Sequence, residues 1–364
     1  MGWSLVVIAL LIVLTMPMSH DPSLSIKKFF TRFLQQIFLM YLVTQLIDSR
    51  KRLFGVLSVL LLTLVFVVID GMAQYTTGRS IVHHTPLIFG RISGPMNHPN
   101  DLGTLLVTVM PVVLTSIIVC RRWMPLQPWV GVAVTSVLFL FLVNALGLTA
   151  SRGAWLAFAV SMGFLGIFLK NRKLTICIFL VLAVFLWVYG VHCLTTRIDM
   201  YDVAPTQGAV LSPANALELL FAPSGRESYW GTAVNVIRHY PWFGCGYSAY
   251  VQTLRDLHVG HEEYPHNSLL HIAAELGLVG LVLYGWFFTA LWLEIKNVLR
   301  EVSSDRDLFL IGCGLSAGIL AWGVHSLMDT AWASLQLGVL WWLFIGILLS
   351  LGVIKKGEKR ASST

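Results

Sequence analysis

Charged residues are scarce in this chain of 364 residues: Asp, Glu, Lys and Arg together make up 12% of it, whereas hydrophobic residues make up 56%. The mean hydropathy is +0.75. A soluble domain of this length would need more charge on its surface, so the composition predicts a membrane protein. The sequence also lacks an internal repeat, a low-complexity tract and a soluble appendage. Its chemistry is therefore expected within the membrane, at the membrane surface or in a loop.

Cysteine is also rare, and no two cysteines have the spacing of a metal site. The five cysteines are Cys120, Cys177, Cys193, Cys245 and Cys313. A disulfide between Cys193 and Cys245 on an outer face is one interpretation, and unpaired apolar cysteines are the other.

Apolar runs predict about ten transmembrane helices, at roughly 20 residues per crossing. The runs lie near residues 3–16, 33–47, 53–69, 102–120, 129–148, 154–169, 174–194, 268–295, 308–328 and 333–354. Residues 1–18 have neither the basic start nor the small-residue cleavage pattern of a signal peptide, so we expect a membrane helix there. The expected fold is all-α, a polytopic membrane helical bundle that forms a single membrane domain over residues 1–364.

The basic residues predict the orientation, because Lys and Arg accumulate in cytoplasmic loops. With residues 50–52 inside, alternation places most of the 25 basic residues inside as well. One large polar loop, residues 195–265, then faces the periplasm. Lys27, Lys28 and Arg32 are an exception, since alternation places them outside. The net charge of +7 mostly reflects this bias, and nucleic acid is not an expected partner.

The polar loop is predicted to contain a short helix. Ser224 and Glu227 have the spacing of a capping box. Apolar residues then recur at helical spacing before Pro241: Trp230, Val234 and Ile237. This pattern is typical of an amphipathic helix on the outer surface of the membrane. The turn-rich, aromatic residues 241–247 predict an interfacial turn after it.

Three residues at outward helix starts are not explained by topology, namely Arg152, Arg226 and His266. Helix N-termini attract phosphate groups, and arginines add paired donors for phosphate oxygens. His266 is suited to take a proton from a hydroxyl group. A pyrophosphate-bearing lipid and a hydroxyl acceptor would fit such a site. The alternative is that the arginines anchor lipid headgroups and that His266 is a linker residue.

A metal site is not expected, although four histidines lie close in sequence: His258, His261, His266 and His271. The segment from His261 to His266 is one residue longer than the zinc motif H-E-x-x-H, and Pro265 would break the helix that this motif requires.

Several segments of the chain, including the one around His266, resemble motifs of bacterial O-antigen ligases and the related lipid-linked polysaccharide polymerases. His266 and Asn267, followed by Gly277 and Gly280, fit the family pattern H-[NSQ]-x9-G-x-x-G. Weaker similarity lies in residues 91–100, 149–154, 226–230 and 240–246. The resemblance runs from about residue 20 to residue 350. Members usually have further helices ahead of the segment that resembles residues 19–26.

The resemblance implies metal-independent, inverting glycosyl transfer without a cofactor, on the periplasmic face of the bacterial inner membrane. The donor would be an undecaprenyl-diphosphate-linked glycan. His266 would be the catalytic base, and Arg152 and Arg226 would bind the diphosphate. Arg91 and Asn267 are possible additional site residues.

The acceptor distinguishes the possible activities. The motif around His266 favours a ligase that uses lipid A core as the acceptor. The alternative is a polymerase that extends a growing polysaccharide. A transporter or flippase in contact with membrane lipid is less favoured, because the midspan residues are almost entirely apolar.

Overall fold

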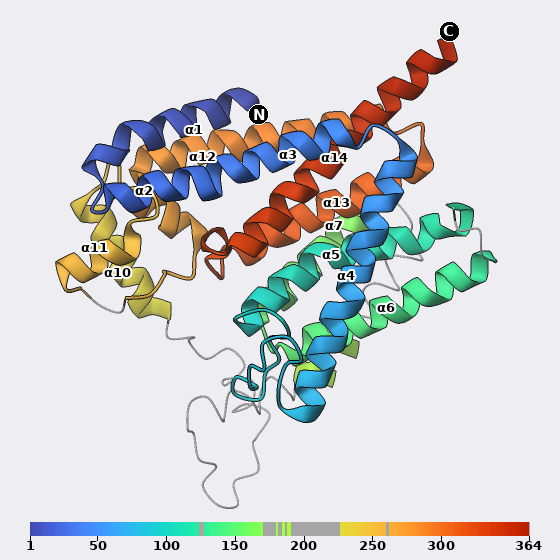
Figure 1. The fold of residues 1–364 in the computed structure, drawn as a ribbon, viewed down its shortest axis with the longest axis horizontal. Coiled ribbons are helices and arrows are strands. Elements are labelled where there is room, and N and C mark those ends of the chain that lie inside the picture. The colour runs from blue at the N-terminus through green and yellow to red at the C-terminus, as the bar shows by residue number, and fades with distance from the viewer. Residues whose placement is uncertain are drawn as a thin grey trace, which may run out of the picture. The chain divides into compact units, whose positions relative to one another are not determined.

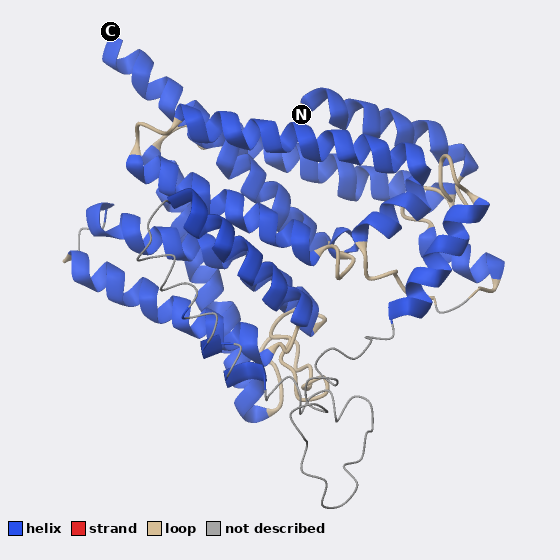
Figure 2. Cartoon of the chain, turned by 180° about the vertical axis from the view of Figure 1, so that it is seen from behind, coloured by secondary structure: helices blue, strands red, loops and turns tan. Residues whose placement is uncertain are grey.

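The computed structural model describes residues 1–123, 127–169, 180, 184–185, 188–190, 226–259 and 262–363. These residues form helices joined by turns and loops, and no strand is drawn among them (Figure 2). The expected all-α membrane bundle is confirmed. Among the described residues, seven helices are long and apolar enough to cross a membrane, compared with about ten expected for the whole chain. Most of the expected span at 174–194 lies outside the described residues.

The seven long helices coincide with seven of the expected apolar runs. They are α4 (Arg50–Thr77), α5 (Pro99–Trp123), α6 (Pro128–Leu148), α7 (Arg152–Leu169), α12 (Ser268–Glu301), α13 (Arg306–His325) and α14 (Leu335–Ser363). Near the N-terminus, α1 (Gly2–Thr15) is shorter. Residues 22–46 are helical throughout, as α2 (Pro22–Lys28), a π-helical segment (Phe29–Leu34) and α3 (Gln35–Leu46). The Asp21 side chain caps α2, because it accepts a hydrogen bond from Leu24 N at 2.8 Å.

The chain divides into two compact units. The first comprises Met1–Asp48, Pro223–Ser304 and Ser326–Thr364, and the second comprises Ser49–Ala222 and Asp305–His325. Within the first unit, α3 packs along α14 and α1 packs along α12 (Figure 1). Within the second unit, α13 packs against α5 and α7, and α5 packs against α6. The single membrane domain over 1–364, with its periplasmic loop at 195–265, stays a prediction.

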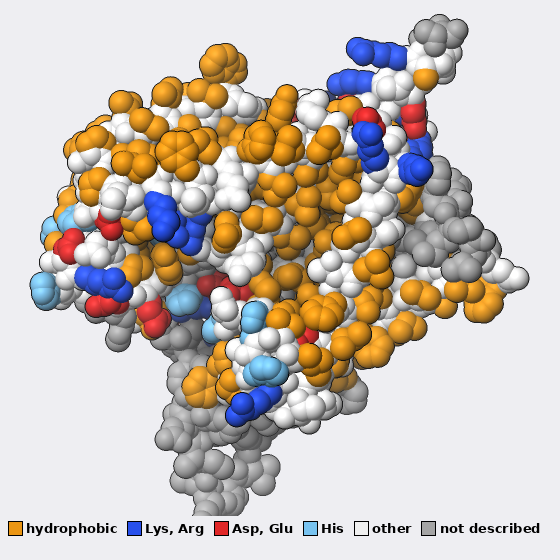
Figure 3. Space-filling model, in the orientation of Figure 1, with side chains coloured by type: hydrophobic (Ala, Val, Ile, Leu, Met, Phe, Trp, Pro, Cys, Tyr) orange, Lys and Arg blue, Asp and Glu red, His pale blue; other side chains and the backbone are white. Residues whose placement is uncertain are grey.

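Large apolar side chains lie exposed on several helices. Trp3 and Leu14 of α1 are 77% and 73% exposed, and Leu62 of α4 is 69% exposed. Hydrophobic side chains cover much of the face shown in Figure 3. Apolar surface on this scale would be unfavourable in water, whereas lipid tails solvate it. The exposed faces therefore agree with a multi-pass membrane protein.

Two short helices cover the beginning of α12 in the first unit. These helices, α10 (Arg226–His239) and α11 (Tyr250–Leu257), enclose a small apolar cluster with α12. The cluster consists of Ala233, Val236, Cys245, Tyr250, Leu254 and Ala274. Cys245 is a buried free thiol, and Cys193 lies outside the described residues.

The predicted helix after residue 224 is confirmed as α10. Trp230 is exposed, whereas Thr232, Ala233 and Val236 are buried. Ile237 is partly buried against the cluster. The buried face is set by contacts with α11 and α12, which the local spacing of apolar residues does not reveal. Ser224 of the predicted capping box lies outside the described residues.

The long helix α12 is broken at Gly277. This residue has φ 68° and ψ −172°, a conformation that is essentially restricted to glycine. Two N–H groups after the break donate to the preceding loop: Leu278 N to Pro241 O at 2.8 Å and Val279 N to Trp242 O at 3.2 Å. The loop therefore replaces hydrogen bonds that a continuous helix would make within itself.

The same loop also donates back to α12. Cys245 N donates to Ala274 O at 2.9 Å, and Gly246 N donates to Glu275 O at 3.0 Å. The two backbones approach so closely that a Cβ atom on Gly244 would lie 2.2 Å from the carbonyl carbon of Glu275. Glycine at this position is therefore required by the contact itself. Residues 241–246 and the break in α12 form one interlocked backbone unit.

We expect Gly277→Ala to disrupt this interlock. A Cβ atom at Gly277 would lie 2.2 Å from Trp242 O, and the positive φ adds strain. The substitution should lower the free energy of unfolding by about 2–4 kcal/mol. The matched control is Gly285→Ala in the same helix, where nothing lies within 4 Å of the added Cβ atom. Thermal unfolding of both purified variants in detergent is the measurement. Equal midpoints for the two variants would contradict the interlock.

Candidate functional site

His266 lies in a tight turn directly before α12. Its φ is 47°, an uncommon left-handed conformation for a residue with a side chain. The next residue, Asn267, caps the helix, because its Oδ1 accepts hydrogen bonds from Leu269 N at 2.9 Å and Leu270 N at 3.1 Å. Asn267 Nδ2 also donates to Leu327 O at 3.1 Å. Both polar atoms of Asn267 therefore help to fix the turn that presents His266.

The imidazole of His266 is oriented by a carboxylate that the sequence did not indicate. Its Nδ1 lies 3.0 Å from Oδ1 of Asp329, in the loop between α13 and α14. This loop is fastened to α12, since Ser268 N donates to Ser326 O at 2.8 Å and Ser268 Oγ donates to the Asp329 carbonyl at 3.2 Å. The start of α12 and the Asp329 loop therefore hold the ring from two sides.

The second ring nitrogen of His266 is available for chemistry. Among the described residues, Nε2 of His266 makes no hydrogen bond, and the side chain is 29% exposed. When Nδ1–H donates to Asp329, the lone pair of the neutral ring lies on Nε2. A hydroxyl group that reaches Nε2 can transfer its proton there.

The first turn of α10 also belongs to this region. The ring of Tyr229 meets His266 edge-on, with centroids 5.5 Å apart. Arg226 begins α10 and precedes Tyr229 by three residues, so the two side chains share a helix face. Burial and the nearby charge of Glu263 raise the pKa of Tyr229, which keeps its hydroxyl protonated at neutral pH. The first unit thus brings two predicted site residues, Arg226 and His266, onto adjoining elements.

The other two predicted arginines belong to the second unit. Arg152 is the first residue of α7. Arg91 Nε donates to Thr149 O at 2.7 Å, and its Nη2 donates to Asn100 Oδ1 at 2.9 Å. Arg91 therefore joins the end of α6 to the first turn of α5, close in sequence to the start of α7. Ser151, the residue directly before α7, has its hydroxyl oxygen 3.4 Å from His325 Nε2.

The segment that carries Arg91 is held by polar side chains of α4. The Asp70 carboxylate is fully buried and accepts a hydrogen bond from Ile81 N at 2.7 Å. One turn further along α4, Gln74 Oε1 accepts hydrogen bonds from Ser93 N and Gly94 N, both at 2.8 Å. Hydrogen bonds to buried polar side chains fix a loop firmly, because leaving such groups unpaired is costly.

Part of the chain matches a known protein family. A family model described as O-antigen ligase matches residues 137–285. Residues 137–285 of the chain are therefore similar to the O-antigen ligase family. The matched segment contains Arg152, Arg226, His266 and the break at Gly277, whereas Asp329 lies beyond it. No curated protein matches the chain significantly.

We expect Asp329→Asn to impair a reaction that uses His266. An amide in place of the carboxylate no longer fixes the Nδ1–H tautomer, so the rate of glycan transfer should fall by about 10²-fold or more. The matched control is Asp256→Asn. It alters a second His–Asp pair, in which the Asp256 carboxylate is exposed and lies 3.0 Å from Nδ1 of His20. Transfer in vitro from a lipid-linked donor is the measurement. Equal rates for the two variants would remove Asp329 from the site.

Proposed function

We propose that the chain transfers a glycan from undecaprenyl diphosphate to an acceptor hydroxyl at the periplasmic face of the bacterial inner membrane. The observation that carries this proposal is the His266–Asp329 pair at the start of α12. In this pair Asp329 orients the imidazole, and Nε2 of the partly exposed His266 is left available as a base. The start of α10, which carries Arg226, adjoins the pair. The family match over residues 137–285 supports the same activity.

In the proposed reaction, Nε2 of His266 takes the proton of the acceptor hydroxyl. The acceptor oxygen attacks the anomeric carbon of the donor sugar from the side opposite the diphosphate. The bond between that carbon and the diphosphate oxygen breaks, and its electron pair leaves with the diphosphate. The new glycosidic bond therefore has the inverted configuration. Negative charge grows on the leaving diphosphate, where fixed cations lower the barrier most.

Arg226 is the proposed partner of the diphosphate in the first unit. It stands at the N-terminus of α10, where the N–H groups of the first turn also favour an anion. Its planar guanidinium can bind two phosphate oxygens at once. Arg152, at the start of α7, is proposed to bind the same diphosphate, with Arg91 as a possible addition. Asn267 is proposed to act on the site through the turn that it caps.

The proposed acceptor is lipid A core, which makes the chain an O-antigen ligase. The resemblance at His266 and Asn267 favours this acceptor. A polymerase that uses a growing polysaccharide as the acceptor would rely on the same base and the same leaving group, so the choice of acceptor alone separates the two activities.

The proposal predicts that His266→Ala remains folded and loses most of its transfer activity. General-base assistance is typically worth about 10²- to 10⁴-fold, and the rate should fall by that amount. The control is His239→Ala, which removes an exposed histidine of α10. Purified protein, a lipid-linked donor and an acceptor glycan suffice for the assay, run with and without EDTA. Full activity of His266→Ala would show that His266 is not the catalytic base. Loss of wild-type activity in EDTA would contradict metal independence.

A further inference from the structure

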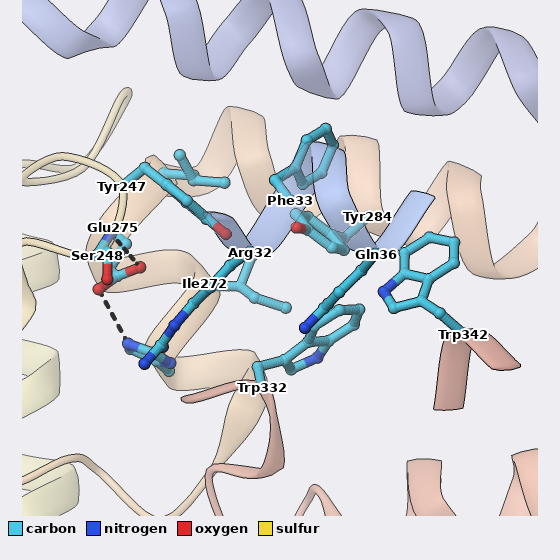
Figure 4. A pocket seen from close by; sticks show the side chains of 12 residues that line it. Arg32, Phe33, Gln36, Tyr247, Ser248, Ile272, Glu275, Tyr284, Trp332 and Trp342 are labelled. Carbon is cyan, nitrogen blue, oxygen red and sulfur yellow. Dashed lines mark hydrogen bonds and ion pairs between the residues drawn. The ribbon is translucent and has the colours of Figure 1, made fainter. Parts of the chain in front are cut away.

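A pocket in the first unit has one polar end and one aromatic end. Arg32 and Glu275 line the polar end, and Tyr284, Trp332 and Trp342 line the aromatic end (Figure 4). The cavity volume is about 40 Å³. That exceeds the roughly 10–15 Å³ that a cavity needs to hold one water molecule, so the pocket is large enough for a small polar group such as a hydroxyl.

The polar end contains buried groups that the proposed reaction does not use. Glu275 and His271 are each only 6% exposed. The Glu275 carboxylate accepts hydrogen bonds from Ser248 N at 2.8 Å and Tyr250 N at 3.3 Å. His271 Nε2 lies 3.0 Å from Glu275 Oε1, but the geometry leaves this nitrogen without a hydrogen bond. A buried, unsatisfied nitrogen is costly, and a polar guest in the pocket would relieve the cost.

Arg32 supplies unused donors to the same pocket. Its side chain extends toward the end formed by Glu275 and Ser248 (Figure 4). Its backbone carbonyl accepts a hydrogen bond from Gln35 N, but within the described part of the chain its guanidinium makes no hydrogen bond or ion pair. It belongs to a group of cations with Lys27 and Lys28, and Arg32 is the main cause of the lowered pKa of Lys28. Lys and Arg are normally retained in cytoplasmic loops. Cations on the opposite face are therefore unfavourable for insertion, and their presence in this segment indicates that they have a function there.

The outer position of this cationic segment is supported by a contact within the first unit. Ser25 Oγ donates to Tyr247 O at 2.7 Å. The start of α2 therefore lies against the loop that interlocks with α12, on the same side as His266.

Arg32 and Glu275 line the same end of the pocket, and together they restrict the chemistry of the guest. A guanidinium only donates hydrogen bonds, and a carboxylate only accepts them. A phosphate or carboxylate guest would meet the negative charge of Glu275, and an amine guest would meet the positive charge of Arg32. A hydroxyl both donates and accepts, so it satisfies both partners. The aromatic side chains beside it suit the apolar C–H face of a sugar ring.

The pocket adjoins the proposed base, because the same two segments build both. The first turns of α12 supply His271 and Glu275 and begin next to His266. The segment after α13 supplies Asp329 to the base and Trp332 to the pocket. The ring of Tyr264 also packs on His271, with centroids 5.1 Å apart.

We propose that this pocket is the subsite for the acceptor sugar. It holds a hydroxyl or hydroxymethyl group between Arg32 and Glu275, with the sugar ring against Trp332, while another hydroxyl of the same glycan faces His266. This inference rests on the proposed function, because it assigns the acceptor of that reaction.

The first test compares Arg32→Gln with Lys27→Gln, which removes an exposed cation of the same cluster outside the pocket lining. Arg32→Gln should raise the KM for the acceptor glycan by about 10- to 100-fold, as expected for the loss of charge-assisted hydrogen bonds. The KM for the lipid-linked donor should stay within about twofold of the wild-type value. Lys27→Gln should change neither KM. An unchanged acceptor KM in Arg32→Gln overturns the subsite. An equal rise of the acceptor KM in Arg32→Gln and Lys27→Gln would show a general effect of charge, and it overturns the subsite as well.

The second test measures binding without transfer. Methyl glycosides of glucose, galactose and N-acetylglucosamine are added to purified protein, and binding is followed by ligand-observed NMR. Signals should appear with the wild-type protein and with His266→Ala, and should disappear with Arg32→Gln and Trp332→Leu. The control for the last variant is Trp242→Leu, since Trp242 is exposed and outside the pocket lining.

The two tests separate failure of the subsite from failure of the proposed function. If the protein binds a glycoside through Arg32 but transfers no glycan, the proposed reaction fails and the sugar subsite stands. If it transfers glycan but no glycoside shows Arg32-dependent binding, the subsite is overturned. Binding of inorganic phosphate in place of the glycosides would also overturn it.

Discussion

The break in α12 is the constraint on which the candidate site depends. A continuous helix would satisfy its own backbone, but at Gly277 the helix instead exchanges hydrogen bonds with residues 241–246. Because the contact is made by backbone atoms of both segments, it fixes their register and leaves no room for a side chain at Gly244 or Gly277. The apolar part of α12, residues 278–301, extends from one side of the break. The polar part, with His271 and Glu275, extends from the other side and lies beneath α10 and α11.

Several parts of the site follow from this arrangement. The cover formed by α10 and α11 brings Tyr229 against His266, and the cap at Asn267 turns the chain so that the imidazole meets Asp329. A backbone with positive φ at His266 is the kind of strain that well-anchored functional residues carry. The polar end of the aromatic pocket uses the same helix turns. Base and pocket are thus two consequences of one broken helix.

The sequence predicted much of this and missed the parts that depend on distant contacts. Hydrophobic runs predicted the helical bundle, and motif spacing predicted that Arg226 and His266 stand at helix starts. Asp329 was missed because it lies 63 residues from His266, in a loop without a motif. The face that α10 buries was not predicted, since the partners α11 and α12 decide which residues it buries. Gly277 was recognised as part of a motif, but its role as a break became evident only from the loop that docks there.

The account requires that His266 and its surroundings face away from the cytoplasm, and labelling of single cysteines tests this most directly. In a variant whose five native cysteines are replaced by alanine, two substitutions introduce exposed thiols: His239→Cys at the end of α10, close in sequence to the loop that contacts the break in α12, and Ser304→Cys just after the C-terminal end of α12. A membrane-impermeant maleimide applied to spheroplasts should label residue 239 at once and residue 304 only after permeabilisation. Labelling of residue 304 but not residue 239 in intact spheroplasts would place the site on the cytoplasmic face and contradict the account.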